Sequence, residues 1–225
     1  MTRVRLMTYN IQLGGRHRQQ LGEVVRAVAP DVLLVNESPH RPLVWKRQCS
    51  DLARRFQMRM VVGGRPGGSC MILVRSGIGV KVTHAEVLAR PPFWPRRGIV
   101  SAQLRVEGAL LGVVGCHLSL KRRERVREVE RVIDVASGLR GPVVVTGDLN
   151  EGPEGQCWHR LAEAGFVDHG DRSWLTFPSD EPAKRIDAIL VRGGAKVIAH
   201  GDPGVPDEDL RAASDHRPVV AELEL

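Results

Sequence analysis

Apolar runs of four to seven residues recur along the whole chain, each bounded by glycine, proline or polar residues. They are rich in β-branched residues, which is typical of strands buried in a sheet. The pattern predicts nine strands, at residues 4–9, 31–35, 58–62, 70–74, 98–104, 110–115, 142–145, 186–191 and 218–223.

Apolar residues at helical spacing occur in only a few segments. One stripe consists of Leu21, Val24, Val25 and Val28, and Pro30 follows it as a stop signal. Two more stripes consist of Trp45, Cys49, Leu52 and Phe56, and of Val126, Val129, Ile133 and Ala136. We expect a fourth, short helix after Glu154. Residues 122–125 either help to hold the substrate or form a solvated start of the third helix, and we expect the latter.

Many strands with few helices between them favour a layered α/β domain, in which sheets pack on each other and helices lie outside. The chain shows no linker, repeat or change of composition, so we expect residues 1–225 to form a single domain. With 42% hydrophobic residues, disorder is excluded. No apolar run approaches the roughly 20 residues that span a bilayer, and no leader-like stretch opens the chain, so we expect a cytoplasmic protein.

Polar residues follow or interrupt the predicted strands at six places. They are Asn10, Glu37, His117, Asp148 with Asn150, Asp187, and Asp215 with His216. Taken singly, most have ordinary interpretations as turn residues, helix caps or solvated loop charges. Asp187 is the exception, because apolar residues flank it and a buried carboxylate needs a partner.

If these strand ends converge, they form a pit of four carboxylates and two imidazoles. Such a pit requires a cation, and oxygen ligands without thiolates suit a hard ion such as Mg²⁺ or Mn²⁺. The four cysteines stand alone, at positions 49, 70, 116 and 157, with no C-x-x-C pair. A zinc site of the usual spacing and a disulfide framework are therefore not expected.

The ordered set of motifs resembles the endonuclease/exonuclease/phosphatase superfamily. The matching segments are Thr8-Tyr9-Asn10-Ile11, Asn36-Glu37, His117-Leu118, Gly147-Asp148-Leu149-Asn150, Arg185-Ile186-Asp187 and Ser214-Asp215-His216-Arg217-Pro218-Val219. They run from residue 8 to residue 219, nearly the whole chain. The resemblance implies a four-layer α/β sandwich, with two mixed sheets face to face and helices on both outer sides.

The resemblance also implies the metal site and part of the catalytic site. Glu37 would be the principal ligand of Mg²⁺ or Mn²⁺, supported by Asn10 and Asp215. Asp148 would orient or deprotonate the attacking water, and Asn150 would bind a phosphate oxygen.

The remaining implied roles belong to the two histidines and their neighbours. His216 would contact the scissile phosphate and be held by Asp187, while His117 would stabilise or protonate the leaving group. Arg97 falls where some members place a phosphate-binding residue, although Arg96 is an alternative match.

Three departures from the family pattern leave the substrate open. The family usually has Gln where Asn36 stands, Cys116 replaces a common Thr, and Ala188 replaces an aromatic residue found in many members. An apolar segment, Pro92-Phe93-Trp94-Pro95, either packs locally or lies at the rim of the site, where it could stack on a base.

The formal net charge is +7, and 28 of the 33 basic residues are arginine. Guanidinium groups favour bidentate contacts with phosphate, although arginines spread over a solvated surface would give the same count. We therefore predict a divalent-metal-dependent phosphoesterase that hydrolyses a phosphodiester, as a nuclease or phosphodiesterase.

Three different functions are also compatible with the sequence. The first is a small-molecule, inositol-phosphate or lipid phosphatase of the same fold. The second is a binding protein on an inactive hydrolase scaffold, and the third is a zinc hydrolase that uses His117 and His216. The expected partner is a phosphate-ester substrate, nucleic acid among the candidates, and no protein partner is predicted.

Overall fold

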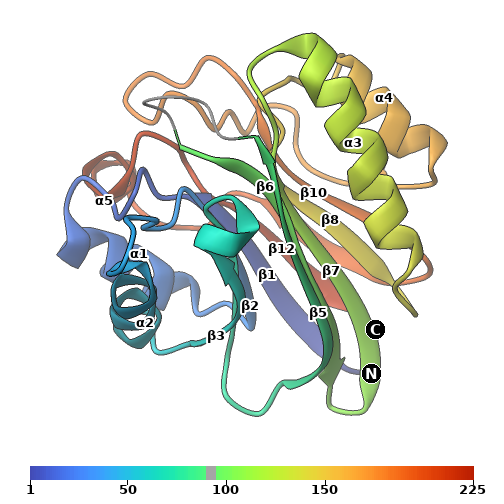
Figure 1. Ribbon diagram of the computed structural model, residues 1–225, viewed down its shortest axis with the longest axis horizontal. Coiled ribbons are helices and arrows are strands. Elements are labelled where there is room, and N and C mark those ends of the chain that lie inside the picture. The colour runs from blue at the N-terminus through green and yellow to red at the C-terminus, as the bar shows by residue number, and fades with distance from the viewer. Residues whose placement is uncertain (90–94) are drawn as a thin grey trace.

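The computed structural model describes residues 1–89 and 95–225, and these residues form two mixed, six-stranded sheets (Figure 1). The first sheet has the order β11 (Lys196–Gly201), β12 (Val219–Glu224), β1 (Arg3–Asn10), β2 (Val32–Asn36), β4 (Cys70–Val74), β3 (Arg59–Gly64). The second has the order β5 (Gly79–Ala89), β6 (Arg97–Val106), β7 (Ala109–His117), β8 (Val143–Asp148), β10 (Asp187–Arg192), β9 (Val167–Asp168). Of the apolar segment at 92–95, residues 92–94 lie outside the described residues.

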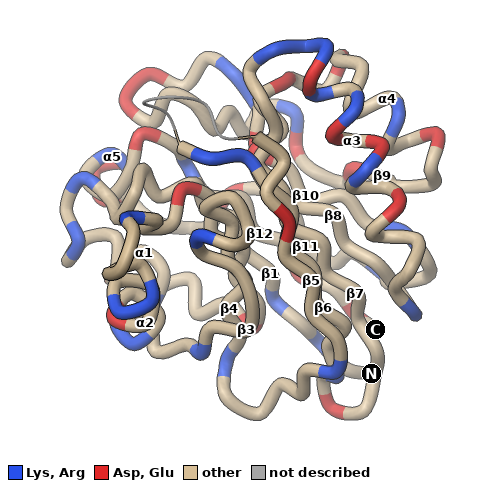
Figure 2. Tube along the Cα trace, in the orientation of Figure 1, with Lys and Arg blue, Asp and Glu red and all other residues tan. Residues whose placement is uncertain are grey.

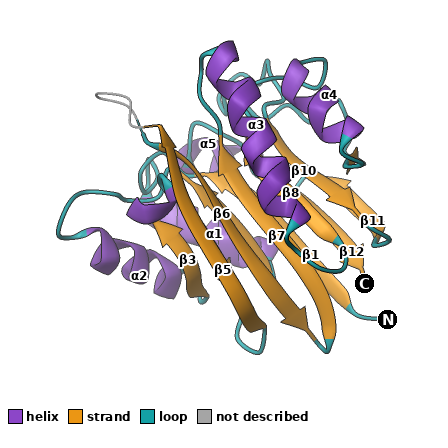
Figure 3. Ribbon diagram, turned by 45° about the vertical axis from the view of Figure 1, so that its right-hand side comes forward, coloured by secondary structure: helices purple, strands orange, loops and turns teal. Residues whose placement is uncertain are grey.

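Helices cover the outer face of each sheet (Figure 3). The first sheet is covered by α1 (Arg18–Val28), α2 (Trp45–Arg55) and α5 (Asp207–Ala213), and the second by α3 (Arg122–Ser137) and α4 (Gln156–Glu163). A short 3-10 turn, η1 (Arg65–Gly67), precedes β4. The predicted four-layer α/β sandwich is confirmed. No helix within the described residues is both long and apolar enough to span a bilayer.

Each of the three interfaces between layers has its own apolar core. Leu34, Ile72, Val100 and Val113 belong to the cluster between the two sheets. A second cluster joins the first sheet to α1, α2 and α5, and a third joins the second sheet to α3 and α4. Burial of these side chains contributes roughly 25 cal/mol per Å² of apolar surface, which makes the layer interfaces the main source of stability.

All nine predicted strands are present, whereas β5, β9, β11 and α5 were not predicted. Strands β5, β9 and β11 form sheet edges, where one side lacks a neighbour and the burial is incomplete, so their sequences carry no continuous apolar run. The buried face of α3 is rotated relative to the apolar stripe that was predicted for this helix. Val126 and Ile133 are only half-buried, while Arg125 and Val132 are buried.

Two glycines bring the sheets together near one end of the sandwich. A Cβ atom on Gly115 of β7 would lie 2.0 Å from Cδ1 of Leu34 in the opposite sheet. Gly147 of β8 has φ +134°, and a Cβ there would lie 2.0 Å from the carbonyl oxygen of Cys116. Leu34 therefore fits between the sheets only because both positions lack a side chain.

Candidate active site

The strand topology brings the predicted residues to one end of the sandwich. Each sheet contains one parallel pair, β1 with β2 and β7 with β8, connected through a helix. Asn10 pairs with Asn36 at the end of the first, and His117 with Asp148 at the end of the second. Strands β10, β12 and β6 run antiparallel to these and therefore begin at this end, with Asp187 opposite Asp148.

Asn36 connects the two sheets directly behind the site. Its Nδ2 donates to the carbonyl oxygen of Cys116 at 2.9 Å, and its Oδ1 accepts from the backbone N–H of Asp148 at 3.0 Å. The side chain is completely buried, so both bonds are shielded from water. Asn36, which stands where the family usually has Gln, thus fixes the backbone of Asp148.

Asp148 lies at the centre of the contacts in the site. Its Oδ2 lies 3.3 Å from Nε2 of His117, 3.9 Å from Nε2 of His216 and 3.1 Å from Nδ2 of Asn10, while its Oδ1 accepts from the N–H of Asn150 at 2.9 Å. Burial alone would raise the pKa of Asp148, but the two imidazoles and the Asn150 amide hold it well below its usual range. The carboxylate is therefore ionised and can accept a proton.

Asp187 and His216 form a buried pair beside Asp148. Nδ1 of His216 lies 2.9 Å from Oδ2 of Asp187, and the Phe177 ring lies against the imidazole with a centroid distance of 4.7 Å. Burial lowers the pKa of His216, but the charge and hydrogen bond of Asp187 raise it to about 10. Nε2 of His216 is thus a protonated donor that faces Asp148 at neutral pH.

Arg97 fixes the orientation of His117. Nη1 of Arg97 lies 3.1 Å from Nδ1 of His117, and a guanidinium can only donate, so the proton of the imidazole lies on Nε2 and faces Asp148. Arg97 is 4% exposed and pairs with no carboxylate among the described residues. A buried cation of this kind requires an anionic partner, which a ligand can supply. Arg97, one of the two arginines considered from the sequence, thus contacts the predicted site residue His117.

Glu37 provides carboxylate oxygen atoms next to the amide of Asn10. Nδ2 of Asn10 lies 3.3 Å from Oε1 of Glu37, and Glu37 is half-buried with φ 56° directly after β2. Asn10 provides the only described hydrogen bond to this carboxylate. A partly buried carboxylate with free lone pairs beside an amide and Asp148 fits a hard divalent cation.

Asp215 and Asn150 complete the predicted set. Asp215 is half-buried, and Ser214 binds both its Oδ1 at 3.3 Å and the carbonyl oxygen of Asn10 at 2.7 Å, which ties this segment to β1. Nδ2 of Asn150 donates to the carbonyl oxygen of Leu118 at 2.8 Å. No direct contact joins Asp215 to Glu37 among the described residues.

Asp148, Asp187 and His216 also form a compact cluster, whose candidate ligand atoms lie within 4.8 Å of one another. His216, however, already faces a carboxylate with each of its nitrogens. We interpret this cluster as an internal ion-pair network, and the oxygen atoms around Glu37 as the better site for a cation. Oδ1 of Asp187 is buried and has no described hydrogen-bond partner.

Several supporting residues were not predicted from the sequence. Oγ1 of Thr176 accepts from the backbone N–H groups of Ile186 and Asp187, at 3.1 and 3.2 Å. The Phe177 ring packs on His216, and Arg125 and Glu128 of α3 bind the loop after His117. These positions carry no motif, because they support the site from segments that are distant in sequence.

Comparison with known families identifies the chain. The model of the Endonuclease/Exonuclease/phosphatase family matches residues 7–216, so the protein belongs to this family, whose members hydrolyse phosphate esters. None of the curated proteins matches the chain at a significant level.

Solved structures of the same fold cover the whole chain. A family protein from Bacteroides thetaiotaomicron is 18% identical with a TM-score of 0.79, over 100% of this chain and 99% of that one. The mannosyl-6-phosphatase Bt3783 of the same organism is 18% identical with a TM-score of 0.78, over 99% and 100%. D. rerio TDP2, complexed with a single strand DNA product, is 15% identical with a TM-score of 0.73, over 100% of both chains. At these identities the likeness shows the shared fold alone.

Proposed function

We propose that the protein is a Mg²⁺- or Mn²⁺-dependent phosphoesterase that hydrolyses a phosphodiester by attack of water. One observation carries this proposal: an ionised Asp148 lies between a protonated His216 and the amide of Asn10, whose Nδ2 also contacts the carboxylate of Glu37. In this proposal the base Asp148, the acid His216 and the cation site at Glu37 are neighbours. Arg97 adds a buried positive charge without a carboxylate partner among the described residues, which suits an anionic substrate.

In the proposed mechanism, Glu37, Asn10 and Asp215 would hold the metal ion. The bound ion would neutralise charge on the phosphate and stabilise the leaving oxygen. The free oxygen atoms of Glu37, which is held in place by the Asn10 amide, support this ligand set.

The protein groups supply the remaining steps. Asp148, which its lowered pKa keeps ionised, orients the attacking water and accepts its proton as the bond to phosphorus forms. His216 donates to the phosphate through Nε2, and Asp187 keeps its Nδ1 side fixed and its charge positive. Arg97 and Asn150 bind phosphate oxygens in this scheme. His117, which Arg97 holds in position, orients Asp148 and would stabilise the leaving group.

The proposed substrate is a phosphodiester in a polyanion, because the basic excess favours a substrate with several phosphates. A small-molecule, inositol-phosphate or lipid phosphatase is the second candidate. This candidate is supported by the similarity in fold to a mannosyl-6-phosphatase, which covers 99% of this chain and 100% of that one.

A substrate panel tests the choice. Plasmid, single-stranded DNA, RNA, bis-p-nitrophenyl phosphate and inositol phosphates would each be assayed with Mg²⁺ or Mn²⁺ at several salt concentrations. A nuclease held by several phosphate contacts loses affinity steeply with salt, whereas an enzyme for small substrates changes little. Turnover restricted to inositol phosphates or other monoesters would replace the phosphodiester assignment with the second candidate.

Two substitutions test the assigned chemistry. Asp148→Asn removes the proton acceptor and His216→Ala removes the donor, so each should lower kcat by about 10²–10⁴-fold. Circular dichroism should show that both variants stay folded. Near-normal kcat in either folded variant would remove the role given to that residue.

An inactive scaffold and a zinc enzyme would each have a distinct signature. An inactive scaffold would not bind Mg²⁺ or Mn²⁺, and its melting temperature would not rise when these ions are added. A zinc enzyme is disfavoured because both nitrogens of His117 already face protein groups, Arg97 and Asp148. The four free, buried cysteines are compatible with a reducing compartment, and we propose a cytoplasmic location.

A further inference from the structure

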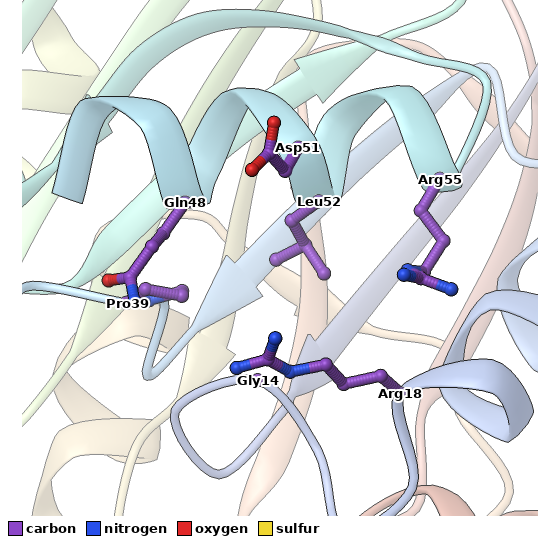
Figure 4. A pocket seen from close by; sticks show the side chains of 7 residues that line it. All are labelled: Gly14, Arg18, Pro39, Gln48, Asp51, Leu52 and Arg55. Atoms are coloured by element: carbon purple, nitrogen blue, oxygen red, sulfur yellow. The ribbon is translucent and has the colours of Figure 1, made fainter. Parts of the chain in front are cut away.

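A cavity opens between α1 and α2, near the segments that carry Asn10 and Glu37 (Figure 4). Gly14, Pro39 and Leu52 form its apolar part, and Arg18, Gln48, Asp51 and Arg55 provide its polar groups. Its volume of about 70 Å³ has room for several water molecules, and therefore for one phosphoryl group.

Two arginines of this cavity lack a partner for their charge. Arg18 begins α1, Arg55 ends α2, and Figure 4 shows both side chains reaching toward the space between the helices. Neither guanidinium forms an ion pair or a hydrogen bond with the described residues. Carbon atoms of the Arg55 side chain would lie 3.0–3.2 Å from a Cβ on Gly22, so the side chain packs along α1.

The acidic residue of the cavity does not neutralise these arginines. Asp51 forms its ion pairs with Arg54 and Arg47 on the exposed side of α2. Helix α2 carries four basic residues, Lys46, Arg47, Arg54 and Arg55, and one acid, Asp51. Arg18 of α1 adds a fifth positive charge at the cavity. The cavity is therefore electropositive.

A neutral hydrogen-bonding group lies beside the two charges. Oε1 of Gln48 is buried and has no hydrogen-bond partner among the described residues. An unmet buried amide oxygen costs about 1–3 kcal/mol, so it indicates a position that a ligand hydroxyl can satisfy. The set of groups fits a phosphoryl group that carries, or lies next to, a hydroxyl.

The cavity is adjacent in the chain to the proposed metal ligands. Pro39 follows Glu37 by two residues, so their Cα atoms lie at most about 7.6 Å apart. Gly14 lies in the loop that follows Asn10. A substrate held at Glu37 can therefore extend into the cavity with its next charged group.

We infer that the cavity between α1 and α2 binds a second phosphoryl group of the substrate through Arg18, Arg55 and Gln48. This inference rests on the proposed function, because it assigns the scissile phosphate to the neighbouring site. It predicts a preference for substrates with two or more phosphates over substrates with one. An oligonucleotide and a small bisphosphate both provide such a group.

The test compares substrates in the Arg18→Ala and Arg55→Ala variants. The ratio of kcat/KM for a ten-nucleotide single-stranded DNA to that for bis-p-nitrophenyl phosphate should fall about tenfold in each. Fructose 1,6-bisphosphate compared with fructose 6-phosphate forms the small-molecule arm. A fall confined to the DNA arm assigns the cavity to a nucleic-acid backbone, and a fall confined to the sugar arm assigns it to a small bisphosphate.

Arg54→Ala is the matched control, because Arg54 lies on the same helix, is 77% exposed and carries the same charge. Ratios in Arg18→Ala and Arg55→Ala that equal those of Arg54→Ala in both arms would overturn the inference.

A binding measurement separates this inference from the proposed function. Anisotropy of the labelled oligonucleotide and competition by fructose 1,6-bisphosphate would be measured on the Asp148→Asn background, without turnover. Arg18→Ala and Arg55→Ala should weaken binding of at least one ligand about tenfold, and for DNA reduce the salt slope by about 0.7 per lost phosphate contact. If wild type hydrolyses nothing yet binding weakens in this way, the cavity assignment stands and the proposed function fails. If binding of both ligands is unaltered, the cavity assignment fails.

Discussion

At the scale of single residues, Asn36 shows how the site depends on contacts between the sheets. Its amide is the partner of two buried backbone groups, the carbonyl of Cys116 and the N–H of Asp148. Asn36 belongs to one sheet and both partners to the other, so the side chain sets the position of the proposed base.

Replacing this amide should affect stability and activity together. Asn36→Ala leaves two buried backbone groups unpaired and should lower the free energy of unfolding by about 2–4 kcal/mol. It should also lower kcat, because the backbone of Asp148 loses its anchor. Urea titration and steady-state kinetics measure the two effects.

Thr8→Val is the control, since the buried hydroxyl of Thr8 has no hydrogen-bond partner among the described residues. Its removal should change stability little. A similar small effect of both variants would contradict the role assigned to Asn36.

His200 provides a second residue-scale prediction, away from the active site. Burial and the Arg185 guanidinium lower the pKa of His200 to about 4, although Asp168 partly opposes them. In the unfolded chain this imidazole is therefore protonated below about pH 6.5, whereas in the folded chain it stays neutral until the pH approaches 4. Stability from the neutral imidazole is complete above pH 6.5 and is lost as the pH falls toward 4.

The measurement is urea unfolding at pH 7 and pH 4.5 for wild type and His200→Gln. Wild type should lose about 2–3 kcal/mol more than the variant between these pH values, by the linkage of pKa to stability. An equal loss in the two proteins would show that His200 titrates normally in the folded state.

The sequence predicted which residues lie together at one end of the sandwich better than it predicted the contacts between them. Asn10, Glu37, Asp148 and Asp187 stand out because polar residues at the ends of apolar strands are unusual. The contact between Arg97 and His117 could not be predicted, because 20 residues separate them and only the β6–β7 register aligns them.

At the scale of elements, α3 has a role that its sequence did not indicate. Residues 122–125 were expected to be solvated, but Arg125 is buried, and its guanidinium donates to the carbonyl oxygens of Ser119 and Leu120. Glu128 accepts from the N–H and the hydroxyl of Ser119, both at 2.7 Å. The helix thus holds the loop between His117 and its own first turn.

Releasing this loop should impair catalysis without removing a reacting group. Asn150 binds the carbonyl oxygen of Leu118 in the same loop, so Glu128→Ala should raise KM for the substrate several-fold and lower stability by about 2–3 kcal/mol. Glu128→Gln retains one acceptor and should recover part of both effects. Steady-state kinetics and urea unfolding would check this, and an unchanged KM in Glu128→Ala would contradict it.

Elements were predicted well where they are buried and poorly where they are exposed. The central strands β1, β2, β7 and β8 are apolar throughout most of their length because both faces are covered. The edge strand β5 alternates only weakly, since most of its side chains are exposed or half-buried. Its pairing with β6, rather than its own composition, makes it a strand.

At the scale of the whole molecule, the two ends of the chain meet in one core. β1 pairs with β12, and the cluster between the sheets includes residues from Val4 to Leu223. We therefore propose that residues 1–225 fold as one domain. Long-range pairing of this kind cannot be read from local patterns, which predict strands but not their order.

The charges are distributed over the surface rather than confined to one region. Figure 2 shows Lys and Arg interspersed with Asp and Glu along the helical layers on both sides of the sheets. Many of these residues pair with each other, as Arg160 does with Glu130 and Glu163. Arg97 of the candidate site and Arg18 and Arg55 of the neighbouring cavity pair with no described carboxylate, so they are more informative than the net charge of +7.

The most direct test of the account is the metal dependence of phosphodiester hydrolysis. The initial rate on bis-p-nitrophenyl phosphate would be measured for wild type and Glu37→Ala after EDTA treatment, and again after addition of Mg²⁺, Mn²⁺ or Zn²⁺. We predict that EDTA abolishes turnover, that Mg²⁺ or Mn²⁺ but not Zn²⁺ restores it in wild type, and that Glu37→Ala needs far more metal for the same rate. Turnover that survives EDTA, or an identical metal requirement in Glu37→Ala, would contradict the proposed metal site.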